Sequence, residues 1–305
     1  MHRRARRPLP QLRRRADGPP FANQGAAGQI SGERREEVQG LKPPPRILSI
    51  AGSDSSGGAG IQADLKTIAM LGGYGMSAIT AVTAQNTLGV QAVEIFEPDF
   101  VIAQVESCLA DIGADAVKIG MLGSARIALA VAKRLDSFAG GIVFDPVMVA
   151  SSGAELADAA TIAGFATLMD LATLVTPNLP ELGALTGMPL GSVDEIGEAA
   201  AVLAARHDTS VLAKGGHAEG ERVVDILVAP GGEAMVFDDA RLPGEHTHGT
   251  GCTLSSAVAT LLGHGQAMPN AVRLARRFVR AAIEHAPGFG GGNGPLGHQA
   301  VRTLT

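Results

Sequence analysis

The chain has 305 residues, of which 46% are hydrophobic and 18% are charged, a composition typical of a globular protein that buries a core. It contains two Cys, one Tyr and no Trp, which exclude a disulfide-rich scaffold and a four-cysteine zinc site and disfavour nucleic-acid binding by base stacking. The net charge is −5 and no run of about 18 apolar residues occurs, so we expect neither nucleic acid nor a membrane as a partner.

The first 45 residues differ in charge from the rest of the chain. They hold ten basic and four acidic residues, a net charge of +6, whereas the remainder carries a net charge of −11. This segment is rich in Arg, Pro and Gly and has no apolar periodicity, so we predict a disordered extension over 1–45 and a single folded domain over 46–305. Its arginines would also suit an organellar transit peptide, and a translation start assigned too early would give the same pattern. The segment contains no apolar stretch of the kind found in secretory signal peptides, so secretion is not indicated and we expect a cytoplasmic protein.

Strand and helix patterns alternate along the rest of the chain. Strands are predicted over 47–51, 76–84, 115–120, 141–145, 174–176, 210–214, 223–229 and 234–237, and helices over 61–71, 98–109, 125–135, 196–205, 251–262 and 270–285. This alternation predicts an α/β fold in which a mostly parallel sheet carries helices on both faces. Ligands of such sheets bind at the carboxyl ends of the strands, so polar residues there are the candidates for function.

A glycine-rich turn over 52–60 follows the first strand. Residues 58–63 match the letters of the dinucleotide-binding pattern, but the strand ends near Ala51 and no acid follows about 20 residues later, so that interpretation is rejected. No Lys followed by Ser or Thr comes after the glycines, which excludes a Walker A loop. Two interpretations remain, a backbone that closely approaches a small ligand or a simple connection from strand to helix. Asp54 and Asp64 beside it would suit helix caps or acids of a first helical turn.

The segment 248–254 opens a helix with the small residues Gly249, Thr250, Gly251 and Cys252. Free backbone N–H groups and the helix dipole make such a terminus an anion site suited to a transferring phosphoryl group. A cysteine in this first turn should have its thiolate favoured. The alternative is a packed helix start in which Cys252 is an inert thiol.

Four polar residues follow predicted strands: Asp145, Asn178, Glu181 and Lys214. Asn178 and Glu181 are three residues apart and suit hydrated Mg²⁺ and phosphate, but the same spacing fits a capping box at a helix start. Asp145 and Lys214 could hold Mg²⁺ and neutralise phosphate charge, or they could form a salt bridge with each other. The eight histidines show no zinc-ligand spacing and none is assigned a role.

Seven blocks in order resemble the hydroxymethylpyrimidine/phosphomethylpyrimidine kinase family of the ribokinase-like superfamily. The blocks are 51–66, 83–87, 118–122, 145–148, 176–181, 214–217 and 247–253. The resemblance implies a three-layer ribokinase-like sandwich, a homodimer and two phosphoryl transfers from ATP with Mg²⁺ in thiamine diphosphate biosynthesis. The first would act on 4-amino-5-hydroxymethyl-2-methylpyrimidine and the second on its monophosphate. The nearest alternative is a pyridoxine/pyridoxal kinase of the same subgroup.

The resemblance also implies roles for individual residues. Gln85 would recognise the pyrimidine edge, because an amide supplies both a donor and an acceptor. The same pocket would be lined by Gly52, Ala59, Asp64, Thr83 and Met121. The catalytic set would be Lys214, Gly249, Thr250, Gly251 and Cys252; the nucleotide would be held by Asn178, Glu181, Lys214 and Thr250, and Mg²⁺ by Asp145 and Glu181. Sugar kinases of the superfamily have an aspartate base where Cys252 stands, so Cys252 is left open as a base or as a member of the anion hole.

Overall fold

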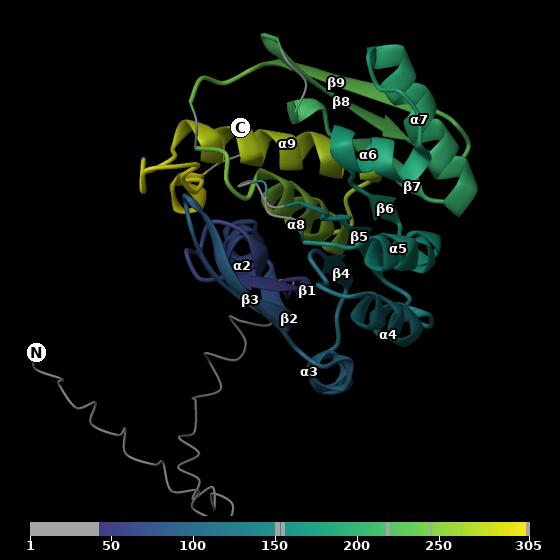
Figure 1. Ribbon diagram of the computed structural model, residues 1–305, viewed down its shortest axis with the longest axis vertical. Helices are drawn as coiled ribbons and strands as arrows, with labels where there is room; N and C mark the ends of the chain where they lie inside the picture. Colours follow the sequence, from purple (N-terminus) through teal and green to yellow (C-terminus); the bar gives the residue numbers. More distant parts are fainter. Residues whose placement is uncertain (1–42, 150–152, 154–155, 218–219, 245, 303–305) are drawn as a thin grey trace, which may run out of the picture. The chain divides into compact units, whose positions relative to one another are not determined.

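The structure is a computed structural model of the chain and describes residues 43–149, 153, 156–217, 220–244 and 246–302, to which the statements below refer (Figure 1). The extension predicted over 1–45 lies outside the described residues except for its last three positions. Residues from Pro44 onward form one compact unit.

The described residues form one nine-stranded sheet in the order β3-β2-β1-β4-β5-β6-β7-β8-β9. The strands are β1 (Arg46–Asp54), β2 (Tyr74–Asn86), β3 (Gly89–Ile95), β4 (Ala116–Ile119), β5 (Gly141–Phe144), β6 (Leu174–Val175), β7 (Ser210–Ala213), β8 (Arg222–Val228) and β9 (Ala234–Ala240). Neighbours from β2 to β7 are parallel, whereas β3, β8 and β9 pair antiparallel at the two ends. The predicted, mostly parallel sheet is therefore confirmed.

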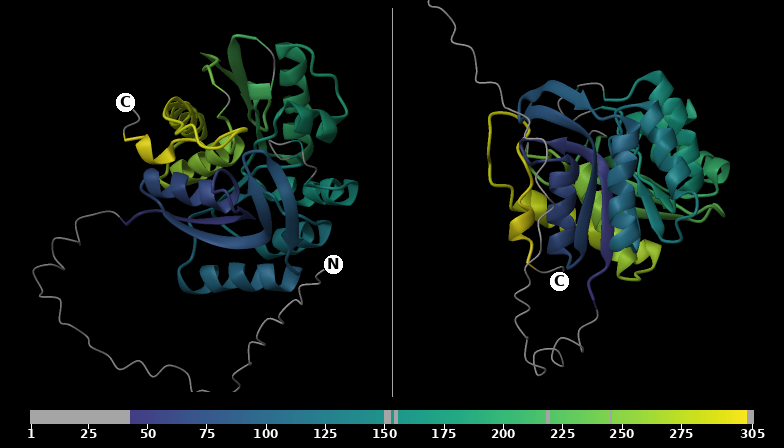
Figure 2. Two further views of the ribbon diagram at one scale, coloured as in Figure 1. Left: turned by 60° about the vertical axis from the view of Figure 1, so that its left-hand side comes forward. Right: turned by 90° about the horizontal axis from the view of Figure 1, so that it is seen from below.

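Helices cover both faces of this sheet, as predicted (Figures 1 and 2). One layer contains α3 (Pro98–Asp111), α4 (Ala125–Leu135), α5 (Ala159–Leu171), α6 (Leu179–Thr186) and α7 (Val193–His207); the other contains α2 (Gly60–Met70), α8 (Thr250–Gly263) and α9 (Met268–Glu284). Successive strand residues alternate between the two cores: Leu48 and Phe144 pack with the first layer, whereas Ile47 and Val143 pack with the second. This alternation explains why the central strands read as continuous apolar runs.

Three described elements are absent from the predicted strands and helices: β3, α5 and α6, of which α6 was anticipated only as a possible helix start after Asn178. β3 is an edge strand whose residues are mostly exposed, so no alternation of buried and exposed residues marks it in the sequence. α5 is apolar around most of its circumference and lacks the polar stripe that identifies an amphipathic helix. In contrast, α4 has the predicted bounds, because Ser124 caps its first turn and its apolar face repeats regularly.

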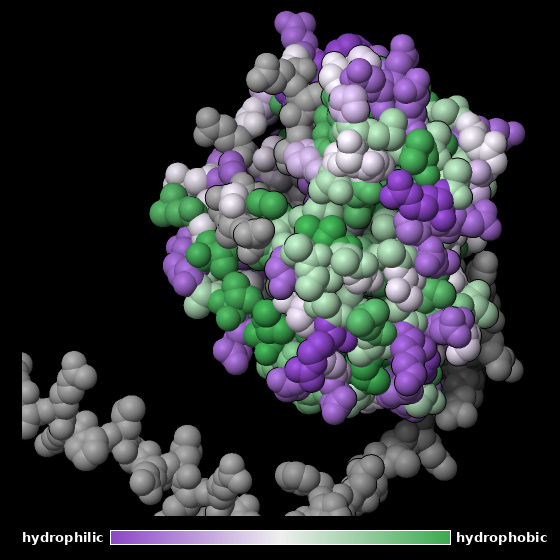
Figure 3. Space-filling model, turned by 45° about the vertical axis from the view of Figure 1, so that its right-hand side comes forward, coloured by the Kyte–Doolittle hydropathy of each residue, from purple (hydrophilic) through white to green (hydrophobic). Residues whose placement is uncertain are grey.

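Hydrophobic and hydrophilic residues are interspersed on the face drawn in Figure 3. None of the helices in the described part of the chain combines the length and the apolar character needed to cross a membrane.

Candidate active site

Charged residues at strand ends lie beside the start of α8. Asp145 directly follows β5, and Lys214 directly follows β7. A Cβ atom placed on Gly251, in the first turn of α8, would lie 3.2 Å from Lys214 Nζ and 3.4 Å from Asp145 Oδ2. The structure therefore brings together the strand-end charges and the helix start that the sequence singled out separately.

Asp145 and Lys214 form the salt bridge that the sequence left as an alternative. Lys214 Nζ donates to Asp145 Oδ1 at 2.7 Å, and Thr176 Oγ1 donates to the same oxygen at 3.0 Å. Burial alone would lower the pKa of Lys214, but the charges of Asp145 and Glu181 outweigh it and raise that pKa. Lys214 is therefore a stable cation next to the helix start, where it can attract a phosphate.

Asn178 and Glu181 form the capping box of α6. Asn178 Oδ1 accepts from the Glu181 N–H at 2.9 Å, and Glu181 Oε2 accepts from the Asn178 N–H at 2.7 Å. Glu181 is only 4% exposed. Burial raises its pKa to about 7, with the charge of Asp145 adding to the rise and that of Lys214 opposing it.

The two buried carboxylates Asp145 and Glu181 fit a magnesium ion that arrives with a nucleotide. No group of three or more His, Cys, Asp or Glu side chains in the described ranges could hold a metal by itself. Mg²⁺ at phosphoryl-transfer sites is usually held by one or two carboxylates together with phosphate oxygens and water. A cation here would also offset the cost of burying the ionised carboxylate, which keeps Glu181 partly protonated.

Glu181→Gln is expected to stabilise the ligand-free protein at pH 8 and to change its stability little at pH 5. The folded chain keeps a proton on Glu181 up to about pH 7, whereas an unfolded chain loses it near the ordinary value of 4.5. The free energy of unfolding of the wild type therefore falls as the pH rises through this window and stays lower above it, by roughly 3 kcal/mol. A neutral amide avoids that loss and can still accept from the Asn178 N–H. Urea unfolding at both pH values measures the difference.

Glu195→Gln is the matched control for this experiment. Glu195 occupies the same third position in the capping box of α7, where it accepts from the Ser192 N–H at 3.1 Å, but near solvent. We expect no pH-dependent gain for this variant. An equal gain for Glu181→Gln at pH 5 and pH 8 would contradict the assigned ionisation.

The glycine turn packs against the start of α8. Gly249 has φ +86°, and a Cβ atom placed on it would lie 2.0 Å from the carbonyl oxygen of Gly58. Asp54 folds the turn by accepting from the N–H groups of Ser56 and Ala59. Gly58 and Gly249 are therefore required because two backbone segments approach each other closely here. The turn does more than connect a strand to a helix.

The first turn of α8 has free donors and a protonated thiol. In the part of the chain that the structure describes, no hydrogen bond takes up the N–H groups of Gly251 and Cys252, whereas the Thr250 N–H donates to Thr247 at 3.3 Å. Burial raises the pKa of Cys252 to about 11; the Lys118 charge opposes the rise and that of Asp64 adds to it. The prediction of a favoured thiolate is therefore wrong, because burial outweighs the helix terminus.

Gln85 lies beside this anion-site candidate. Its carboxamide is 3.3 Å from His248 Nε2, one residue before Gly249, and its other end is 3.1 Å from Thr83 Oγ1. Gly52 faces Met121, whose methyl carbon would lie 2.6 Å from a Cβ atom at that position. Most of the residues predicted to line the pocket belong to the glycine turn, the end of β2 or the loop after β4. They are Gly52, Ala59, Thr83, Gln85 and Met121.

Asp64 is the exception among the residues expected to line that pocket. It is fully buried, and its carboxylate accepts from Lys118 Nζ at 2.8 and 2.9 Å, from Ser49 Oγ and from Ser256 Oγ at 2.6 Å each. These partners belong to β4, β1 and α8. The structure therefore does not bring Asp64 to the pocket surface and makes it the centre of a buried ion pair instead.

Two buried residues near the site, His248 and Lys118, were assigned no role from the sequence. His248 is 5% exposed and lies 2.8 Å from Asp54 Oδ2, so it joins the α8 segment to the glycine turn. The sequence feature that could have indicated a role for His248 is its position directly before the small residues of the helix start. Lys118 is fully buried inside β4, and a lysine within an otherwise apolar strand indicates a buried partner.

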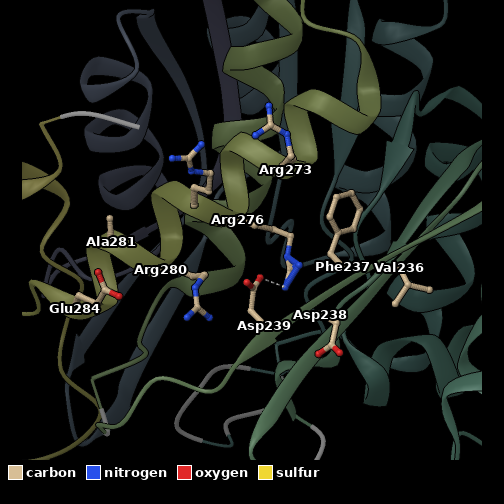
Figure 4. A pocket seen from close by; sticks show the side chains of 10 residues that line it. Val236, Phe237, Asp238, Asp239, Arg273, Arg276, Arg280, Ala281 and Glu284 are labelled. Carbon is tan, nitrogen blue, oxygen red and sulfur yellow. Dashed lines mark ion pairs between the residues drawn. The ribbon is translucent and has the colours of Figure 1, made fainter. Parts of the chain in front are cut away.

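A separate hollow of about 560 Å³ lies between β9 and α9 (Figure 4). Four arginines of α9 and the acids Asp238, Asp239 and Glu284 line it. Arg276 points to Asp239, with which it forms an ion pair at 3.0 Å, and a second ion pair joins it to Asp225. These charges nearly cancel, and the hollow lies at an edge strand rather than at the ends of the parallel strands.

Two crystal structures indicate the class of protein that this fold and site define. Pyridoxal kinase from Bacillus subtilis in complex with ADP aligns with a TM-score of 0.79 and 37% identity, over 85% of this chain and 99% of that one. Phosphomethylpyrimidine kinase from Clostridium difficile aligns with a TM-score of 0.70 and 41% identity, over 78% and 99% of the two chains. The fold is that of the ribokinase-like small-molecule kinases.

Sequence comparison identifies the family within that class. The family model for phosphomethylpyrimidine kinase matches residues 54–297, so the chain belongs to this family. The hydroxymethylpyrimidine/phosphomethylpyrimidine kinase of Streptomyces coelicolor is 46% identical over 256 residues, which are 84% of this chain and 94% of that protein. A thiamine biosynthesis bifunctional protein of Geobacter sulfurreducens is 45% identical over 260 residues, and the chain spans about half, 53%, of its length.

Proposed function

We propose that the protein transfers a phosphoryl group from ATP to 4-amino-5-hydroxymethyl-2-methylpyrimidine, and then a second one to the resulting monophosphate, in thiamine diphosphate biosynthesis. The observation that carries this proposal is the position of Gln85, whose amide lies 3.3 Å from Nε2 of His248. His248 directly precedes the helix start that carries the free N–H groups of Gly251 and Cys252. An aromatic ring held by that amide would have its hydroxymethyl group near an anion site. Family membership supports the same activity.

The residues around the site have complementary tasks in this reaction. The N–H groups of Gly251 and Cys252, aligned with the helix dipole, stabilise the negative charge on the phosphoryl group while it is being transferred. Lys214 adds a positive charge beside them. We assign Asn178 and Thr250 to orienting the nucleotide phosphates, and Asp145 and Glu181 to Mg²⁺. Magnesium, when bound with ATP, would supply Lewis-acid charge neutralisation of the phosphates.

Cys252 acts in this proposal through its backbone N–H rather than as a base. A thiol whose pKa is about 11 is protonated near neutral pH and is a poor acceptor for the hydroxyl proton. Phosphoryl transfer depends mainly on positioning and charge stabilisation, so a strong base is not required. The second transfer needs a base even less, because its acceptor is already an anion.

The decisive experiment is a phosphate-transfer assay that is followed to product identity. Purified protein with ATP and Mg²⁺ should convert the pyrimidine alcohol first to the monophosphate and then to the diphosphate. The second candidate function is phosphorylation of pyridoxal, which the similarity to the pyridoxal kinase of B. subtilis favours. Faster turnover of pyridoxal than of the pyrimidine would reverse the choice, and formation of no product from either would overturn both.

Gln85→Ala is expected to raise KM for the pyrimidine by about 10- to 100-fold, because two hydrogen bonds to one ring edge are lost. KM for ATP should stay within about twofold, since this side chain contacts Thr83 and His248 rather than the Lys214 side of the site. Gln91→Ala is the control, because Gln91 is exposed on β3 and its side chain bonds, among the described residues, to Asn86 and Gly89 near the start of that strand. Equal increases in both KM values for Gln85→Ala would argue against recognition of the pyrimidine by this amide.

We also propose that residues 46–305 act as one kinase domain and that the protein is a cytoplasmic homodimer. Removal of residues 1–44 should leave kcat in the phosphate-transfer assay unchanged if the folded part carries the activity.

Light scattering after size-exclusion chromatography measures the oligomeric state of the protein, and cell fractionation measures its location.

A further inference from the structure

The imidazole of His248 lies between the acid that folds the glycine turn and the amide proposed to read the pyrimidine. Its Nε2 atom is 2.8 Å from Asp54 Oδ2 and 3.3 Å from the nearest amide atom of Gln85. The residue is 5% exposed, and a Cβ atom on Gly58 would lie 2.4 Å from its ring, so the surroundings hold the ring in one place. No step of the proposed phosphoryl transfer uses this ring.

Asp54 determines which atom of His248 carries the hydrogen. The Asp54 carboxylate also accepts from the N–H groups of Ser56 and Ala59 at 2.8 and 2.9 Å. Burial works to raise the pKa of Asp54, but the bonds from His248, Ser56 and Ala59 outweigh burial and lower it. An ionised carboxylate 2.8 Å from a ring nitrogen requires a hydrogen between them. His248 is therefore protonated on Nε2, since the other tautomer would place two lone pairs in contact.

This hydrogen in turn decides how the Gln85 amide is oriented. If the amide N–H group of Gln85 faced the protonated Nε2 of His248, two hydrogen-bond donors would face each other. The amide oxygen can instead accept from the same Nε2–H that donates to Asp54, as the longer part of a three-centre hydrogen bond. The other end of the amide lies 3.1 Å from Thr83 Oγ1, whose own hydrogen can go to the carbonyl of Ser53 at 3.1 Å. Since amide nitrogen and oxygen have nearly the same shape, the hydrogens assign oxygen to the His248 side and nitrogen to the Thr83 side.

We propose that His248 is a positioning residue that locks the Gln85 carboxamide in this orientation and thereby makes the site select a 4-amino ring edge over a 4-oxo edge. The inference rests on the proposed function. In the locked orientation one N–H and one oxygen lone pair remain free, and they match a ring nitrogen beside an exocyclic amino group. A 4-oxo ring presents the donor and acceptor in the opposite order. An amide free to turn about its last bond would accept either edge, whereas a locked amide accepts only one.

The first test compares kcat/KM for the pyrimidine alcohol with kcat/KM for its 4-oxo analogue. His248→Phe should lower the preference for the amino substrate by about 10-fold or more, because the amide can then turn. His248→Gln should restore the preference, since its terminal N–H can replace the ring N–H toward Asp54. His264→Phe, at the exposed far end of α8, is the control and should match the wild type. An unchanged preference in His248→Phe, with both substrates slowed equally, would overturn the proposal in favour of a structural role.

The second test does not depend on activity. In two-bond ¹⁵N–¹H NMR spectra of the ligand-free full chain, Nε2 of His248 should have the chemical shift of a protonated ring nitrogen. An unprotonated Nε2 would overturn the proposal whatever the assay gives. If the wild type phosphorylates neither pyrimidine, the proposed function fails. The chemical shift of Nε2 still decides whether His248 donates a hydrogen bond to Asp54 and can orient the Gln85 amide.

Discussion

Gly249→Ala is expected to lower kcat for pyrimidine phosphorylation by about 100- to 1,000-fold, the usual cost of displacing anion-hole donors. The residue has φ +86°, and the new Cβ atom would lie 2.0 Å from the Gly58 carbonyl oxygen and 3.2 Å from Ala59 Cα. Both neighbours are backbone atoms of the glycine turn, so no side-chain rotation relieves the overlap. The start of α8 and the turn must move apart, which moves the N–H groups of Gly251 and Cys252.

Gly265→Ala separates this displacement from simple backbone strain. Gly265 lies just beyond the other end of α8 with φ +82°, and apart from its own residue and its chain neighbours no heavy atom of the described residues lies within 4 Å of the position of its Cβ. Both variants pay roughly 1 kcal/mol for a left-handed alanine, but only Gly249→Ala adds a collision. Steady-state kinetics and thermal melts of both variants measure the difference. Similar kcat values for the two variants would show that the proposed anion hole is not formed by this helix start.

Most of the sheet could be predicted from the sequence because the central strands are buried on both sides. Val143 and Phe144 face different cores, so β5 appears as an uninterrupted apolar run that ends at Asp145. β3 could not be predicted, since an edge strand with exposed side chains obtains its stability from pairing with β2. The same reason applies to α5, whose burial depends on its neighbours rather than on its own periodicity.

The site was partly predictable, because some of its chemistry depends on spacing and some on contacts between distant segments. Asn178 and Glu181 are three residues apart, so their capping box could be anticipated together with their position after a strand. The partnership of Asp54 with His248 joins residues 194 positions apart, which no local pattern indicates. The state of the Cys252 thiol likewise depends on how deeply α8 is buried and on the charges behind it.

Asp64 shows how a residue in a family signature can act through packing. Its side chain comes from α2 but bonds to Ser49 on β1, Lys118 on β4 and Ser256 on α8. The charge of Lys118 also acts on the Cys252 thiol, where it opposes the rise in pKa that burial causes. The ion pair therefore lies behind the helix start and supports its position without facing the pocket.

Asp64→Asn is expected to lower the free energy of unfolding by about 3–5 kcal/mol, because it leaves the ammonium of Lys118 buried without a counter-charge. Both side chains are 0% exposed, so water cannot replace the lost partner. Asp115→Asn is the matched control, since its ion pair with Arg46 is 36–43% exposed, and it should cost less than about 1 kcal/mol. Urea unfolding of both variants measures the two values.

The double variant Asp64→Asn with Lys118→Met identifies the cause of this loss. Removing both charges leaves no unpaired ion in the core, and the new amide can still accept from Ser49 and donate to Ser256. The double variant should therefore recover most of the stability that Asp64→Asn loses, which a double-mutant cycle expresses as a coupling energy. A double variant that is less stable than either single variant would mean that the side chains contribute through shape and packing, and that charge pairing does not explain their burial.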